Sequence, residues 1–204
     1  MKTKKILLSL LILFLSLILI IVFSNLIYFT NIISSSELVN GYVQREYVQI
    51  ELYGKTWDDD LSTISGKLKI LDNNGNEIAV IERSWAGAYL AVEFNIVSFD
   101  GKQYIFPHCI YGKNRIYEGK DLKKKGINLE KYYIDNKECL LLGNGCSPKS
   151  RHELYKIERF SNSVFFNLLA GEKSIYTVDL SKCKTGYKYS INYSESEGFT
   201  LKEI

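Results

Sequence analysis

The sequence predicts a mainly β domain, built as a sandwich or a partly closed antiparallel barrel, behind a single N-terminal transmembrane helix. The first observation is a run of 31 uncharged residues, Ile6–Ser36. The second is a series of short β-branched and aromatic segments in the rest of the chain, which are separated by turn residues. The third is the scarcity of proline: Pro107 and Pro148 are the only two, so no Pro-rich linker divides residues 41–204. We therefore expect one β-rich domain after the helix.

The apolar segment has the length and the flanking charges of a membrane anchor. A helix needs about 20 residues to cross a hydrocarbon core of about 30 Å. Lys2, Lys4 and Lys5 precede the segment, so the positive-inside rule places the N-terminus in the cytoplasm and the rest of the chain outside the cell membrane. The alternative is a cleaved signal peptide, whose apolar core is normally only about 7–15 residues long. The expected divisions are a cytoplasmic basic tip at 1–5, a signal-anchor at 6–29, a juxtamembrane linker at 30–40 and an extracytoplasmic β-rich domain at 41–204.

In the first half of the domain, alternating and β-branched segments predict five strands. Asn74-Gly75 favours positive φ and predicts a type I′ hairpin turn, and Asp100-Gly101 predicts a second reversal of the chain. Pro107 has no backbone N–H to donate, so we expect it to end the strand that precedes it. The expected strands are Gly41–Leu52, Lys67–Leu71, Glu77–Trp85, Tyr89–Phe99 and Gln103–Phe106.

The second half of the domain is less regular. Ser150 and Glu153 have the spacing of a capping box, which predicts a helix over Arg151–Arg159. The same residues also alternate as a strand would, so both alternatives stay open. Gly126 follows Asp121–Lys125 as a C-cap would follow one helical turn. The expected hairpins pair Tyr132–Ile134 with Glu138–Leu142, Ser163–Leu169 with Ser174–Leu180, and Tyr187–Tyr193 with Phe199–Ile204.

Four cysteines, Cys109, Cys139, Cys146 and Cys183, all follow the apolar segment. An even number outside the cytoplasm permits two disulfides, and we expect Cys139–Cys146, across a glycine-rich loop, together with Cys109–Cys183. Buried free thiols are the alternative, because cysteine is often an interior residue. No Cys-x₂-Cys or His-x₃-His spacing is present, so neither a metal site nor a cofactor is predicted.

One segment has the outline of a catalytic strand end. It reads Asp-Leu-Ser-Lys-Cys, ends at Cys183, and follows both an N-terminal anchor and an upstream His108. A β-barrel with these features resembles the sortase transpeptidases, in which a Thr-Leu-x-Thr-Cys strand end is followed by an arginine on the next strand. Leu180 and Cys183 match that motif, whereas no arginine follows Arg159. The resemblance implies Cys183 as nucleophile, His108 as base, and Lys188 in place of the arginine donor.

Charge balance and aromatic content separate the function classes. Three N-terminal lysines account for the formal charge of +3, so residues 37–204 hold 23 basic and 23 acidic groups, and nucleic-acid binding is not expected. Fourteen of the 15 tyrosines lie in the domain with Trp57 and Trp85, and aromatic rings make contact surfaces for peptides or sugars. The leading hypothesis is a noncatalytic binding or envelope-assembly module. Its expected partners are the lipid bilayer, through residues 6–29, and another envelope protein or glycan. A membrane-anchored cysteine-dependent enzyme is the alternative.

Overall fold

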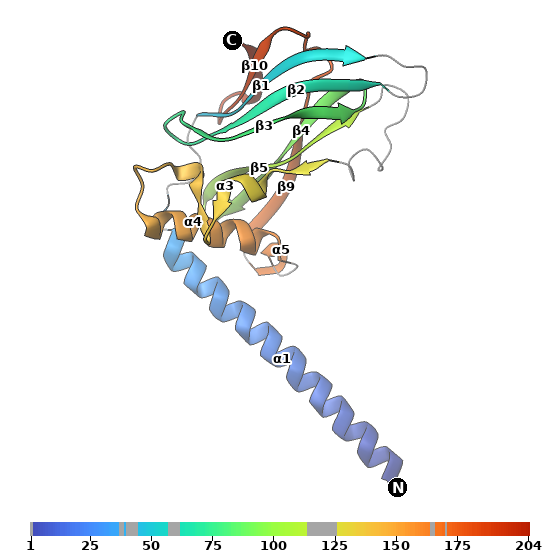
Figure 1. Cartoon of the computed structure of the whole chain (residues 1–204). Helices are drawn as coiled ribbons and strands as arrows, with labels where there is room; N and C mark the ends of the chain where they lie inside the picture. The colour runs from blue at the N-terminus through green and yellow to red at the C-terminus, as the bar shows by residue number, and fades with distance from the viewer. Residues whose placement is uncertain are drawn as a thin grey trace.

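The computed structural model describes residues 2–36, 39, 45–56, 62–113, 126–163, 166–169 and 171–204. In these parts of the chain the predicted architecture is confirmed: the domain is mainly β, and its two larger sheets are antiparallel and do not close into a barrel. A layer of short helices covers one face of the second sheet, and a long N-terminal helix leaves the domain on that side (Figure 1). Trp57 and the helical turn expected at Asp121–Lys125 lie outside the described residues.

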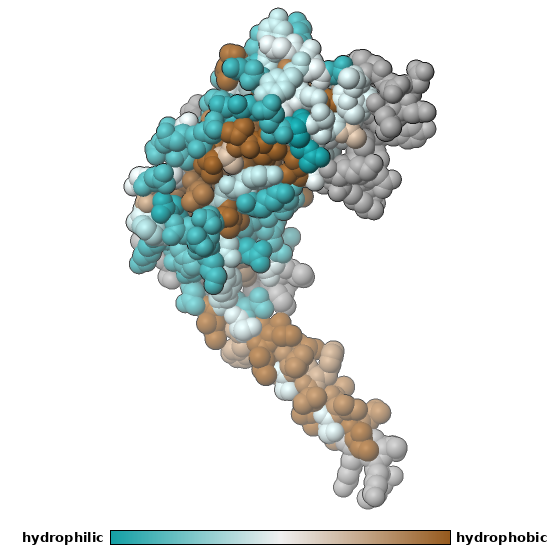
Figure 2. Space-filling view, in the orientation of Figure 1, coloured by the Kyte–Doolittle hydropathy of each residue, from teal (hydrophilic) through white to brown (hydrophobic). Residues whose placement is uncertain are grey.

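The N-terminal helix, α1 (Lys2–Ser36), contains a segment that is long and apolar enough to cross a membrane. This segment is Ile6–Asn31, with 26 residues and a mean hydropathy of 3.4 in its most apolar window. At 1.5 Å per residue it is about 39 Å long. Figure 2 shows its hydrophobic surface projecting from a mostly hydrophilic domain. Residues 30–36, expected as part of a linker, continue the helix.

The five-stranded sheet, sheet A, contains the first three strands and the last two. The strand Thr63–Leu71, which includes the predicted Lys67–Leu71, alternates between half-buried and buried side chains, with Ile64, Leu68 and Ile70 fully buried. Asp72 Oδ1 accepts the backbone N–H groups of Asn74 and Asn76 in the expected hairpin turn. Only Gly75 has positive φ there, so the predicted type I′ turn is wrong. In spatial order the strands are β11 (Gly198–Glu203), β10 (Lys188–Ser194), β1 (Arg45–Thr56), β2 (Thr63–Leu71) and β3 (Glu77–Ala86).

The four-stranded sheet, sheet B, shows that Pro107 does not end its strand. The strand continues to Lys113, because a β-bulge accommodates the proline: Pro107 pairs with Phe94 and Cys109 with Glu93, which leaves His108 as the extra residue. In spatial order the strands are β6 (Ile127–Asn128), β5 (Lys102–Lys113), β4 (Tyr89–Phe99) and β9 (Gly171–Asp179).

The helical layer settles the open assignment of residues 151–159 in favour of helix. Ser147 is the N-cap, since its Oγ accepts the Ser150 N–H at 3.1 Å, and Pro148 begins the helix, so the capping box predicted at Ser150 and Glu153 is wrong. The hairpin predicted from Ser163–Leu169 is also wrong, because that segment is partly helical and residues 171–173 already belong to β9. The layer consists of α3 (Glu130–Tyr133), the short bridge of β7 (Ile134–Asp135) with β8 (Glu138–Cys139), the 3₁₀ turn η1 (Leu140–Leu142), α4 (Pro148–Ser161) and α5 (Phe166–Leu169).

A cluster of aromatic rings joins α1 to the domain. The ring of Phe29 lies 6.0 Å, centroid to centroid, from both Phe99 of β4 and Phe160 of α4. Tyr28 contacts Phe160 at 5.6 Å, and Phe160 contacts Phe166 of α5 at the same distance. Ring pairs in this range contribute about 0.5–1.5 kcal/mol each beyond the burial of their surface. The C-terminal part of α1 is therefore packed against the domain.

The chain passes from sheet A to sheet B between β3 and β4, at Gly87, and a second glycine makes room for this crossing. Gly87 has a φ of +135°, and the next residue, Ala88, donates its N–H to the carbonyl of Lys113 at 2.8 Å. A Cβ on Gly112 would lie 1.8 Å from the carbonyl oxygen of Ala86. Neither backbone segment can shift without disturbing a sheet.

Gly112→Ala is therefore expected to lower the free energy of unfolding by more than about 3 kcal/mol, because the added methyl group forces the two sheets apart. Gly54→Ala is the matched control, since no atom lies within 4 Å of its added Cβ, and its effect should stay below about 1 kcal/mol. Urea unfolding in detergent, followed by far-ultraviolet circular dichroism, measures both. Equal unfolding midpoints for the two variants would contradict the role assigned to Gly112.

Candidate functional site

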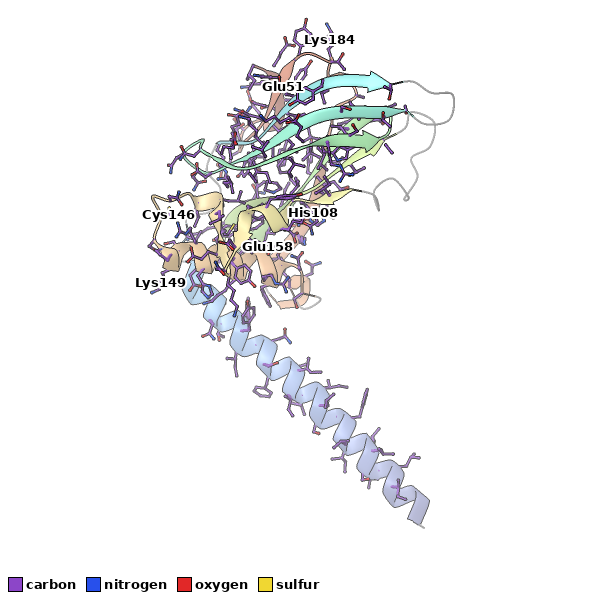
Figure 3. The ribbon with its side chains drawn as sticks, in the orientation of Figure 1. Glu51, His108, Cys146, Lys149, Glu158 and Lys184 are labelled. Atoms are coloured by element: carbon purple, nitrogen blue, oxygen red, sulfur yellow. The ribbon has the colours of Figure 1, made fainter. Side chains whose placement is uncertain are left out.

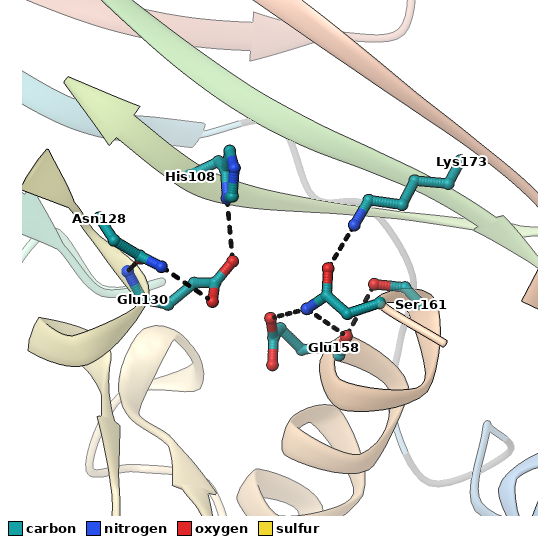
Figure 4. A network of polar contacts seen from close by, with 7 residues as sticks. His108, Asn128, Glu130, Glu158, Ser161 and Lys173 are labelled. Atoms are coloured by element: carbon teal, nitrogen blue, oxygen red, sulfur yellow. Dashed lines mark hydrogen bonds and ion pairs between the residues drawn. The ribbon is translucent and has the colours of Figure 1, made fainter. Parts of the chain in front are cut away.

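Two groups of polar side chains, one with an ion pair and one with hydrogen bonds alone, face one another between sheet B and the helices (Figure 4). On one side, His108 of the β5 bulge lies 2.9 Å, through Nδ1, from Oε1 of Glu130 in α3. Asn128 donates its side-chain amide to the other carboxylate oxygen of Glu130 at 3.4 Å. The β-bulge that follows Pro107 turns the side chain of His108 towards α3.

On the other side, Glu158 of α4 accepts a hydrogen bond from the side-chain amide of Asn162 at 2.7 Å. The amide oxygen of Asn162 in turn accepts a hydrogen bond from Lys173 of β9. Glu158 is only 1% exposed, and its Oε2 has no hydrogen-bond partner among the described residues. Figure 3 shows Glu158 and His108 in the same region, between sheet B and the helices.

The environments of the two carboxyl groups separate their pKa values. Burial disfavours the charged form of Glu130, but the hydrogen bond and charge of His108, with smaller contributions from Asn128 and Lys173, together outweigh burial and hold the pKa of Glu130 below its usual value. Burial, and then the negative charge of Glu130, raise the pKa of Glu158 to about 7. Burial lowers the pKa of Lys173, against the opposing effect of the two carboxylates. Near neutral pH Glu130 is therefore ionised, whereas Glu158 retains a proton part of the time.

Carboxyl pairs of this kind occur as general acid and base in enzymes and also in buried structural networks. Here the polar groups bond mainly to one another and connect β5 with α3 and α4 with β9. Within the described ranges, no three His, Cys, Asp or Glu side chains are grouped closely enough to hold a metal ion. We assign the network the structural role of fixing the helices on sheet B.

The predicted disulfides are not present. All four cysteines lie in described parts of the chain, and all four are free. Cys109 lies in a small cluster with Ala91 and Tyr111, whereas Cys183 belongs to the main core, so the two sulfurs occupy different clusters. Cys139 is fully buried in that core, and only Cys146 is partly exposed. The structure therefore agrees with the alternative of free, largely buried thiols.

Cys183 and His108, the residues of the sortase resemblance, have different partners, and His108 pairs with Glu130. The charged groups that act on the Cys183 thiol are Lys55, Asp179 and Glu203, and His108 is not among them. Burial, the largest effect, raises the pKa of Cys183 to about 11, and burial likewise raises the pKa of Cys139 to about 12. A nucleophilic cysteine requires the opposite shift, because the thiolate is the reactive form.

Most of the aromatic residues singled out in the sequence pack in the interior. Trp85 is 3% exposed, so it offers no binding surface. Tyr47, Tyr189 and Tyr193 are also buried. Tyr53 and Tyr187 are each 45% exposed to solvent. Packing therefore explains most of the described tyrosines.

A lysine-lined pocket of about 100 Å³ lies on the outer face of sheet A. Lys67, Lys69 and Lys188 line it together with Glu51. Lys69 pairs with Glu77 at 2.7 Å, and Lys188 lies 3.8 Å from Glu51. Because two of the three lysines have carboxylate partners, this surface has the character of an ordinary solvated sheet face.

The edge strand β9 is a surface that the sequence did not reveal, because Ser174–Leu180 was expected to pair with Ser163–Leu169. Instead β9 pairs with β4 from Gly171 to Asp179 and forms the edge of sheet B. Ile175 is 53% exposed and Tyr176 is 46% exposed. The ring of Tyr176 stacks on Phe199 of β11, with centroids 4.8 Å apart, so the two sheets meet along this side. An apolar strand edge is the strongest candidate for a binding surface in the described structure.

Comparisons with protein families, with curated proteins and with solved structures find no match for this chain. Its own geometry is therefore the basis for assigning a function.

The buried network predicts a pH dependence of stability. Because the pKa of Glu158 rises from 4.5 to about 7 on folding, its contribution is complete below about pH 4 and is lost as the pH rises through 7. Glu158→Gln keeps the acceptor for Asn162 without the titration. It should be about 2–3 kcal/mol more stable than the native chain above pH 8 and similar to it near pH 4. Urea unfolding across this pH range tests the prediction. Glu172→Gln, at an exposed position of β9, is the control and should keep the pH dependence of the native chain. If Glu158→Gln also keeps that pH dependence, the prediction is refuted.

Proposed function

We propose that this chain is a single-pass protein of the cell membrane whose β domain lies outside the cytoplasm and serves as a noncatalytic binding module for another envelope protein. The apolar segment Ile6–Asn31 supports the anchor, and the lysines at positions 2, 4 and 5 support the orientation. The raised pKa values of the Cys139 and Cys183 thiols support a role without cysteine catalysis.

The exposed edge of β9 carries the binding part of the proposal. Its backbone pairs with β4 on one side, and on the other side it meets no strand of the described chain. A row of unpaired backbone N–H and C=O groups beside apolar side chains is a template on which another chain can add a strand. The regular spacing of these groups fits a polypeptide better than a glycan, so we assign the partner as a protein.

The surroundings of β9 limit where the partner segment binds. The ring of Phe166 in α5 lies so close to Gly171 that a Cβ there would come within 2.7 Å of it, so the start of the strand is covered. Residues 174–179 remain, a length of about 20 Å at 3.4 Å per residue. A short extended segment of about six residues fits this length, and Ile175 supplies its apolar contact.

The proposed topology predicts the behaviour of reporter fusions. Alkaline phosphatase needs disulfides that form outside the cytoplasm, so it should be active when fused after Ile204. Replacing Lys2, Lys4 and Lys5 by glutamate should lower that activity severalfold, because the orientation signal is removed. Replacing Lys67, Lys69 and Lys188 by glutamate is the control and should leave it unchanged. An inactive fusion to the native chain would reverse the proposed orientation.

The proposed docking edge predicts a position-specific loss of binding. Ile175→Lys places a charge beside the exposed backbone and should weaken the partner's binding at least tenfold, whereas the free energy of unfolding changes by about 0.5 kcal/mol or less. Val80→Lys is the matched control, since Val80 is 39% exposed on β3, the edge strand of sheet A. Tagged chains are purified from solubilised membranes, and co-purified proteins are quantified. A protein lost selectively with Ile175→Lys supports the proposal, and equal recovery of every protein with both variants refutes it.

A further inference from the structure

Helix α4 lies at the level where α1 would leave the bilayer. A hydrocarbon core of about 30 Å takes up about 20 residues of the 26-residue span, so Tyr28 and Phe29 fall at the headgroup level, where aromatic side chains are favoured. Both rings contact Phe160 of α4, at 5.6 and 6.0 Å. Figure 1 shows α4 lying across the C-terminal part of α1, at the base of the domain. These contacts hold α4 beside the membrane surface.

The exposed charges of α4 are positive. Lys149 and Arg159, near its two ends, are exposed, and neither forms an ion pair with another residue that the structure describes. Arg159 is also close enough to Tyr28 for the two side chains to interact electrostatically. Figure 3 shows Lys149 at the end of α4 that lies beside α1. Arg159 therefore lies at the aromatic junction, and Lys149 lies at the opposite end of α4, beside α1.

The remaining charges of α4 are already paired or face the interior. Arg151 forms an ion pair with Glu138 at 2.6 Å, and Lys156 forms one with Glu153 at 3.0 Å. Glu153 and Glu158 are 6% and 1% exposed, so neither carboxylate opposes the cations at the surface. This division gives α4 a neutral inner side and a cationic outer side.

We propose that α4 is a membrane-contact helix, and that Lys149 and Arg159 bind the phosphate groups of anionic phospholipids in the leaflet that α1 enters. Each lysine or arginine close to an anionic membrane surface increases the binding constant for that surface about fivefold. The proposal rests on the membrane span proposed above but needs neither the orientation of the chain nor the β9 edge. Lipid is the occupant chosen because α1 itself delivers α4 to the headgroups, so no separate partner has to be recruited.

The test uses the full chain in nanodiscs made of phosphatidylcholine alone or of equal parts phosphatidylcholine and phosphatidylglycerol. Hydrogen exchange of the amides of residues 148–161 should be at least about fivefold slower with phosphatidylglycerol. The double variant Lys149→Gln, Arg159→Gln should lose this slowing. The matched control is Lys184→Gln with Lys202→Gln, and it should retain the slowing. Both lysines are exposed: Figure 3 shows Lys184 at the end of the domain away from α1, and Lys202 lies on β11 of sheet A. Raising the salt to about 1 M, where charges are screened beyond about 3 Å, should abolish the slowing in the native chain.

The outcomes separate this inference from the proposed anchor. A chain that does not incorporate into nanodiscs overturns both. An incorporated chain whose exchange is the same in the two lipid mixtures overturns the lipid contact alone. Slowing that persists in the Lys149→Gln, Arg159→Gln variant also overturns it, because the effect would then come from the bilayer and not from these side chains.

Discussion

The burial of β4 on both faces is the constraint on which the three layers depend. Phe94 packs towards sheet A, with its ring 4.6 Å from Phe199, whereas Phe99 points the other way and contacts Phe29 and Phe166. A strand buried on both sides must be apolar along nearly its whole length, and Tyr89–Phe99 has that character. Its two buried polar residues, Glu93 and Asn95, are on the same face as Phe99, the helix side, where the polar network also lies. One strand therefore holds sheet A, the helices and the anchor in a single core.

Local sequence signals predicted the elements that depend on neighbours in the chain. Alternation marked β1 and β4, and Asn74-Gly75 marked the hairpin turn between β2 and β3, because both effects act over a few residues. The errors arose where distant residues decide the conformation. Pro107 continues a strand because a bulge at His108 of β5 restores its pairing with β4, and Ser174–Leu180 joins β4 although Ser163–Leu169 is its nearer neighbour along the chain. Such pairings leave no trace in a short stretch of sequence.

The candidate surfaces were less predictable than the fold. Glu130 and Glu158 read as ordinary surface acids, and only the docking of α3 and α4 on sheet B buries them and separates their pKa values. The cysteines failed for a related reason: their even number permits disulfides, but the separate clusters of Cys109 and Cys183 prevent the expected pairing. The composition of the chain specifies which groups are present, whereas function depends on which face each one occupies.

The rigid junction with α1 also sets the direction from which a partner would reach β9. In the proposed membrane arrangement, the start of β9 at Gly171 lies beside α5 on the side of α1, and its end at Asp179 pairs with Ala91 at the far end of sheet B. Ile175 is four residues along the strand from Gly171, about 14 Å at 3.4 Å per residue. An added strand would therefore run away from the bilayer, and its contact with Ile175 would lie well above the headgroups. A partner that meets this requirement has an extended segment held upright near the membrane, as a second anchored protein would.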